Sequence, residues 1–67
     1  MSVAKIAEIT ASSPISFDDA VKTGIARASK TLKNVTGAWV SEQKLTVADG
    51  AVTAYRVTLK ITFILED

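Results

Sequence analysis

Alternation of apolar and polar residues identifies the last part of the chain as a β-strand. From Tyr55 to Leu65 every second residue is apolar, and polar or charged residues stand between them as far as Thr62. A period of two puts these two sets on opposite faces of a strand. The sequence therefore predicts a strand with one face buried, formed by Tyr55, Val57, Leu59, Ile61, Phe63 and Leu65.

A turn signal stands before this strand. Asp49-Gly50 favours a two-residue type I′ turn, in which both positions need positive φ, and β-forming residues flank it on both sides. The sequence therefore predicts a hairpin with a register set by the turn. In that register the pairs facing the core are Val40–Leu59 and Ala38–Ile61, and the pairs facing away from it are Trp39–Lys60, Ser41–Thr58 and Gln43–Arg56.

A helical period precedes the hairpin and predicts a helix over 16–33. Ser16 is a good N-cap, and Asp19 three residues later completes a shortened capping box. Acidic residues in the first turn and basic residues in the last two suit the helix macrodipole, and Asn34 is the expected stop. The apolar stripe consists of Phe17, Val21, Gly24, Ile25, Ala28 and Leu32.

A short β-forming run over 3–10 and a loop over 11–14, which contains Pro14, complete the order of elements. The sequence thus predicts an α+β fold of β-α-β-β order, with a three-stranded antiparallel sheet wrapped around one helix. A single domain over 1–67 is expected. Near the turn this register leaves four apolar residues on the face away from the helix, so either a β-bulge re-aims them or a neighbouring subunit covers them: Leu45, Val47, Val52 and Ala54.

Composition strengthens the case for a neighbouring subunit. The chain has 67 residues, of which 48% are hydrophobic, and it contains neither cysteine nor histidine. A domain of this size buries only about 60% of its unfolded surface, and no disulfide or thiolate metal site is there to reinforce it. Self-association is therefore the expected source of additional stability.

The same composition narrows the function. Without histidine or cysteine the chain lacks the usual general base and the strongest nucleophile, and it has no phosphate-binding glycine loop, so we expect no enzymatic activity. A net charge of +1 does not suggest nucleic-acid binding, and no apolar run approaches the length of a membrane span. The start of the chain does not read as a secretory signal, so a cytoplasmic protein is expected.

Trp39 stands out among the candidate binding residues, because the predicted register places it on the polar face of the sheet. It is either buried in a subunit contact or exposed as a stacking surface for a flat ligand. Arg56 and Lys60 share its face and offer charge for a phosphate or carboxylate, provided that another subunit supplies the opposite wall.

The chain resembles the dodecin family over essentially its whole length. The residues that carry this resemblance are Ser16-Phe17-Asp18-Asp19-Ala20, Arg27-Ala28-Ser29-Lys30-Thr31-Leu32, Asp49-Gly50, Tyr55-Arg56-Val57 and Phe63. Dodecins are small bacterial and archaeal β-α-β-β proteins that assemble into hollow dodecamers. Many bind flavins in pairs between subunits, sandwiched by symmetry-related tryptophans, and are thought to store or sequester flavin. The resemblance thus implies a homododecamer that binds FMN or riboflavin.

The resemblance also implies a location for the ligand, at Gly37, Trp39 and Arg56. An ungapped alignment puts Gly37 at the position of the family's stacking tryptophan, with Trp39 two residues later, and Arg56 at that of its flavin-binding glutamine. Some dodecins do not bind flavin, and one type is associated with calcium. The second hypothesis is therefore a structural or calcium-associated shell, in which Glu42 would join a cation site only through symmetry.

Overall fold

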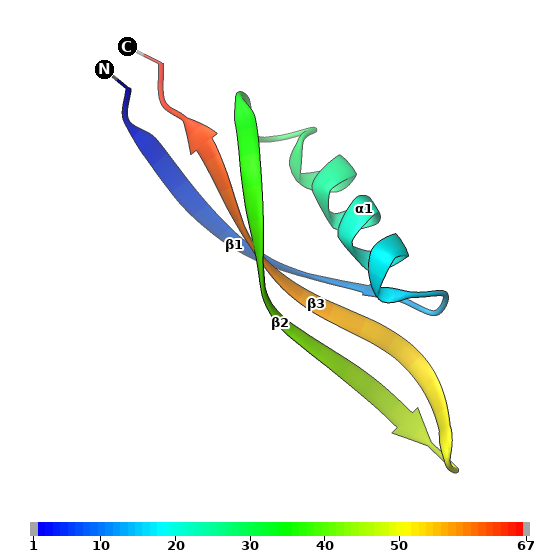
Figure 1. Cartoon of the computed structure of the whole chain (residues 1–67). Helices are drawn as coiled ribbons and strands as arrows, with labels where there is room; N and C mark the ends of the chain where they lie inside the picture. Colours follow the sequence, from blue (N-terminus) through cyan, green and yellow to red (C-terminus); the bar gives the residue numbers. More distant parts are fainter. Residues whose placement is uncertain (1, 67) are drawn as a thin grey trace.

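The computed structural model describes residues 2–66 and has the predicted element order. Strand β1 (Ala4–Ser13) leads into helix α1 (Phe17–Ala28), and strands β2 (Val35–Ala48) and β3 (Ala51–Ile64) form the hairpin. The sheet is antiparallel with the strand order β1-β3-β2, so β3 lies in the centre, and α1 lies across one face (Figure 1). The predicted fold class is confirmed.

The core is small and is centred on β3. Val57, Leu59 and Ile61 are completely buried beneath α1, which contributes Ala20 and Ala28. β3 supplies most of this core because it alone has a strand on each side as well as a helix above it. Partly buried apolar residues surround this cluster: Ile9, Ala11, Phe17, Val21, Ile25, Leu32 and Val35. Within residues 2–66 no helix is long and apolar enough to cross a membrane.

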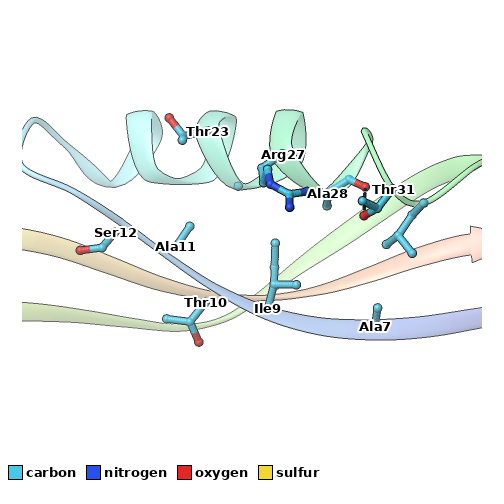
Figure 2. Close-up of a pocket in the computed structure, with 11 residues that line it drawn as sticks. Ala7, Ile9, Thr10, Ala11, Ser12, Thr23, Arg27, Ala28 and Thr31 are labelled. Carbon is cyan, nitrogen blue, oxygen red and sulfur yellow. Dashed lines mark hydrogen bonds between the residues drawn. The ribbon is translucent and has the colours of Figure 1, made fainter.

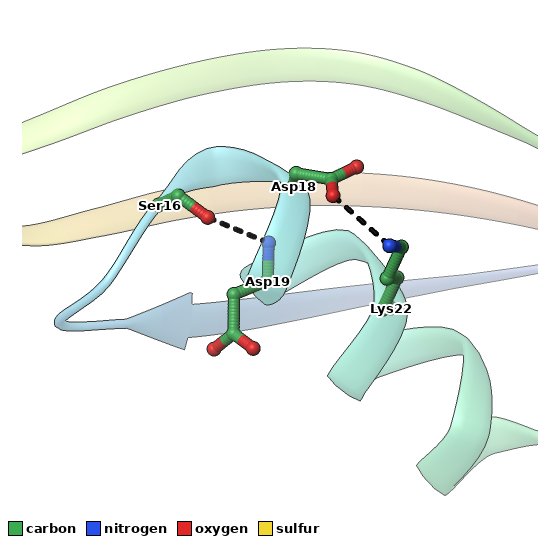
Figure 3. A network of polar contacts seen from close by, with 4 residues as sticks. All are labelled: Ser16, Asp18, Asp19 and Lys22. Atoms are coloured by element: carbon green, nitrogen blue, oxygen red, sulfur yellow. Dashed lines mark hydrogen bonds and ion pairs between the residues drawn. The ribbon is translucent and has the colours of Figure 1, made fainter.

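The start of α1 has the predicted cap. The Ser16 hydroxyl accepts a hydrogen bond of 2.9 Å from the Asp19 backbone N–H, and Lys22 forms an ion pair of 3.2 Å with Asp18 (Figure 3). The buried Ser13 hydroxyl donates a 2.6 Å hydrogen bond to the Asp19 carboxylate and accepts one from the Ile15 N–H. The cap is therefore tied to the end of β1, which fixes where the helix leaves the sheet.

Two predicted boundaries are wrong. The helix ends at Ala28 rather than at residue 33, because the following turn tightens through hydrogen bonds such as Lys30 N–H to the Arg27 carbonyl. Asn34 then adopts a positive φ of 63°, which redirects the chain into β2. The first strand runs to Ser13 rather than to residue 10, because residues 11–13 continue the ladder with β3.

Three β-bulges change the predicted hairpin register. Extra residues at Thr36 and Ser41 on β2 and at Thr53 on β3 offset the pairing, and the Ser41 hydroxyl donates to the Thr58 carbonyl. The predicted pairs Val40–Leu59, Ala38–Ile61 and Trp39–Lys60 are confirmed. The predicted pairs Ser41–Thr58 and Gln43–Arg56 are wrong, since the bulge replaces them with Glu42–Thr58 and Lys44–Arg56.

The bulges also move apolar side chains at the hairpin tip to the helix side of the sheet. Leu45 pairs with Tyr55, whose ring packs edge-to-face on Phe17 of α1, and Val47 pairs with Val52 on the same face. Ala54 keeps the predicted face, opposite Thr46. Leu45, Val47 and Val52 are nevertheless 50%, 59% and 44% exposed, because the tip extends beyond α1.

Gly24 allows α1 to approach the sheet closely. A Cβ at this position would lie 3.0 Å from both the Ala11 Cβ and the Leu59 Cδ1. Leu59 is fully buried, so its side chain has little freedom to move aside. The helix–sheet distance therefore depends on the absence of a side chain at Gly24.

We expect Gly24→Ala to lower the free energy of unfolding by about 1 kcal/mol. Overpacking typically costs about 1–3 kcal/mol, and the higher helix propensity of alanine offsets about 1 kcal/mol of that. Gly37→Ala is the matched control, because a Cβ there meets nothing within 4 Å. Urea unfolding at one protein concentration measures both, and a Gly24→Ala variant as stable as Gly37→Ala contradicts the close-packing explanation.

Candidate functional site

The face of the sheet opposite α1, called here the outer face, carries all three predicted ligand-binding residues, Gly37, Trp39 and Arg56. Paired residues of neighbouring strands point to the same side, so the register defines its membership. From β1 to β2 its rows are Ser12–Arg56–Lys44, Thr10–Thr58–Glu42, Glu8–Lys60–Trp39 and Ile6–Thr62–Gly37. The outer face is thus mostly polar, with one large aromatic side chain.

Trp39 is 62% exposed on this face. The Lys60 ammonium lies 4.9 Å from the centroid of its ring, within the range of a cation–π interaction. At an exposed site such a contact contributes about 0.5–1 kcal/mol, enough to favour one orientation of the indole. One side of the ring is therefore occupied by a cation of the same chain, and the indole is held as a flat platform.

Gly37 lies beside this platform. It is two residues before Trp39 on the same strand and face, which separates the two positions by about 6.6 Å. Because a Cβ at Gly37 would meet no atom within 4 Å, the surface next to the indole is open. The structure thus brings two of the three predicted site residues together.

Arg56 does not join them within one chain. It lies four residues from Lys60 along β3, a separation of about 13 Å. Its cross-strand neighbour is Lys44 rather than the predicted Gln43, so two cations stand side by side at this position. Arg56 is therefore placed to contact the end of an extended ligand, or a ligand shared with a second copy.

Glu42 is the outer-face residue that the sequence pattern misplaced. The bulge at Ser41 turns Glu42 to the outer face, in the row next to Trp39, whereas uninterrupted alternation would put it on the helix side. No residue type in this segment signals the bulge. Among residues 2–66 no group of three metal-ligating side chains occurs, so the two carboxylates of the outer face, Glu42 on β2 and Glu8 on β1, do not form a cation site within this range of one chain.

A groove lies on the helix side of the sheet, between α1 and the edge strand β1. This groove has a volume of about 530 Å³ and an apolar lining that includes Ile9, Ala11, Gly24, Ala28 and Leu32. The Arg27 side chain reaches from α1 toward β1 at the groove (Figure 2). The periodicity of the sequence gave no sign of this groove, in which Arg27 is the charged lining residue.

Comparison with known proteins gives a consistent result. The family model named Dodecin matches residues 3–66. The dodecin from Streptomyces davaonensis is 33% identical, with a TM-score of 0.93, and the match covers 98% of this chain and 97% of that one. None of the curated proteins matches the chain in a sequence search.

Two other solved structures extend the comparison. An arginine-to-alanine variant of the Thermus thermophilus dodecin is 31% identical, with a TM-score of 0.94 and complete coverage of both chains. The calcium dodecin from Mycobacterium tuberculosis, described as having a novel calcium-binding site, is 29% identical, with a TM-score of 0.82. That match covers 96% of this chain and 91% of the calcium dodecin.

The Lys60–Trp39 contact predicts how small ions reach the indole. At about 5 Å an ammonium raises the local concentration of an anion about twofold after screening by salt. We expect Lys60→Met to lower the iodide quenching constant of Trp39 about twofold and to leave the caesium constant unchanged or raise it. Since the chain has a single tryptophan, Stern–Volmer titrations report on this residue alone.

Lys22→Met is the control, because Lys22 is an exposed cation on α1 with no contact to the indole. It should leave both quenching constants unchanged. A tryptophan that neither ion quenches would instead indicate that Trp39 is covered in a subunit contact, the alternative that the sequence left open.

Proposed function

Because the chain belongs to the dodecin family, we propose that it is a homododecameric protein that stores or sequesters FMN or riboflavin between its subunits. Family membership indicates a small binding protein and implies self-association. Beyond this, we propose that the assembly has twelve copies and that its ligand is flavin. The observation that carries it is the exposed, oriented indole of Trp39 on the outer face.

Stacking on Trp39 suits a flavin because the isoalloxazine ring is large, flat and aromatic. Aromatic stacking contributes about 1–3 kcal/mol per ring in comparable base-binding sites. Lys60 covers one side of the indole, so the ligand takes the other, and the open surface at Gly37 gives room for a ring system wider than the indole. One exposed platform forms only half of a sandwich, so Trp39 of a second copy is the proposed opposite wall.

The cations Arg56 and Lys44 extend the proposed site toward a phosphate. An arginine side chain binds phosphate oxygens through charge-assisted, often bidentate hydrogen bonds. Arg56 lies about 13 Å from Lys60 along β3. The ligand must therefore have a flexible tail, or the neighbouring copy must contribute to the site. We therefore propose that FMN binds more tightly than riboflavin, through contacts between its phosphate and Arg56.

The proposed role is storage rather than flavin-dependent catalysis. The chain has no histidine or cysteine to transfer protons or electrons beside the isoalloxazine ring. Stacking against an electron-rich indole instead quenches the excited flavin, which protects the cell from its photochemistry. A calcium-associated assembly, suggested by the Mycobacterium tuberculosis relative, would need Glu42 from several copies around a symmetry axis.

Titration with FMN and with riboflavin tests the proposal directly. We expect flavin fluorescence to be quenched on binding, and Trp39→Ala to weaken binding about 5- to 150-fold, which corresponds to about 1–3 kcal/mol of lost stacking. Trp39→Phe retains an aromatic face and should lose less. Arg56→Met removes the charge without introducing a hydrogen-bonding amide, so it should weaken FMN binding and leave riboflavin binding unchanged.

Light scattering during size-exclusion chromatography controls for assembly. The Trp39→Ala variant should keep the molar mass of the wild type, so that the loss of binding is attributed to stacking alone. A wild-type protein that quenches neither flavin contradicts the flavin proposal. If calcium then changes its molar mass, and Glu42→Gln abolishes that change, the calcium-associated assembly is the better description.

A further inference from the structure

The end of the β2–β3 hairpin lacks support within its own chain. β1 pairs with β3 only as far as the Ser13–Tyr55 pair. Leu45 lies opposite Tyr55, and beyond this pair the rest of residues 45–54, called here the hairpin extension, continues as two strands alone. Figure 1 shows the extension running past the start of α1. A two-stranded ribbon is marginally stable in water, and this one exposes Leu45, Val47 and Val52 on a single face.

The groove between α1 and β1 lacks an occupant. Its lining includes the small residues Ala7, Ala11 and Ala28. Its volume of about 530 Å³ and its apolar lining fit aliphatic side chains. β1 is an edge strand, so nothing in residues 2–66 closes the groove from that side.

Both surfaces also carry a charge that is not neutralised within the described chain. The ion pairs of residues 2–66 comprise only Lys22–Asp18, so Arg27 at the groove and Asp49 at the tip of the extension lack ionic partners there. The two charges are opposite in sign. An ion pair at the margin of an apolar contact is screened less by water and salt than one on an open surface.

We propose that the hairpin extension of one copy fills the α1–β1 groove of a second copy, with Asp49 of the first pairing with Arg27 of the second. The two surfaces match in chemistry, apolar against apolar and acid against base. The extension and the groove lie on different parts of the molecule, so the extension does not fill the groove of its own chain. This deepens the proposed homo-oligomer, on which it rests, by naming the surfaces that meet.

The symmetry of such a contact follows from its geometry. Extension and groove are different surfaces, so each copy gives one extension and receives another, which makes the contact heterologous. Heterologous contacts form rings when the rotation closes, and a ring is a building unit compatible with a closed cage of twelve copies. Each groove is incomplete without the residues that the next copy contributes.

A double-mutant cycle tests the ion pair. Asp49→Asn keeps a residue that tolerates the positive φ of 51° at this position, and Arg27→Gln keeps a good helix former. We expect each single variant to raise the concentration at which the oligomer dissociates at least about tenfold, and the double variant to be no weaker than either single one. Sedimentation velocity over a dilution series measures this.

Lys30→Gln is the matched control, because it removes a nearby cation that does not line the groove. It should leave dissociation unchanged. Additive effects of Arg27→Gln and Asp49→Asn would overturn the proposed pairing, and so would single variants that dissociate like the wild type.

Cross-linking tests the apolar contact without depending on stability. Since the chain has no cysteine, Val47→Cys and Thr23→Cys introduce unique thiols on the extension and at the groove. Mixing the two variants and adding a short bis-maleimide should join one of each. Val47→Cys mixed with Lys60→Cys, whose thiol lies on the outer face, should not form this product.

The outcomes separate this inference from the proposed function. An oligomer that binds flavin but gives no Val47–Thr23 cross-link overturns the inference and leaves the flavin proposal intact, with the groove free for another occupant. An oligomer that cross-links and shows the coupling but quenches no flavin supports the inference and contradicts the flavin proposal. A wild-type monomer at all concentrations overturns both.

Discussion

The close packing of α1 on the central strand is the constraint on which the rest of the structure depends. Val57, Leu59 and Ile61 are the only large side chains fully buried in the described chain, and the helix reaches them because Gly24 carries no side chain. A core of this size covers only the middle of a hairpin whose strands have 14 residues each. Much of the apolar surface therefore stays outside it, and a single chain has few means to bury it.

The bulges determine which apolar side chains are left outside and on which side. The extra residue at Ser41 separates a stretch in which Trp39 points to the outer face from one in which Leu45 points to the helix side. Because Thr53 is an extra residue on β3, Val52 pairs with Val47, and both side chains point to that same side. As a result the aromatic platform and the hairpin extension face opposite directions, so one surface can hold a ligand while the other joins a neighbour.

Both surfaces are half-sites, and this links assembly to function. An indole exposed on one side stacks against a flat ligand but does not enclose it, and an apolar groove at a sheet edge stays open until another chain closes it. In a closed assembly each copy completes its neighbours. A chain without cysteine, without histidine and with a small core can then gain stability and a binding site from the same contacts.

Sequence alone determined the element order, the helix cap at Ser16, the Asp49-Gly50 turn and the core face of β3, because these depend on periods and residue types within short segments. It also singled out Trp39 and its neighbour Lys60, since their register is set by the same alternation. Tertiary structure alone decided the end of α1, the place of Glu42 and the groove beside Arg27. A bulge or a helix end reflects the best total fit between strands and helix, and a groove exists only between elements distant in sequence, so no local pattern encodes them.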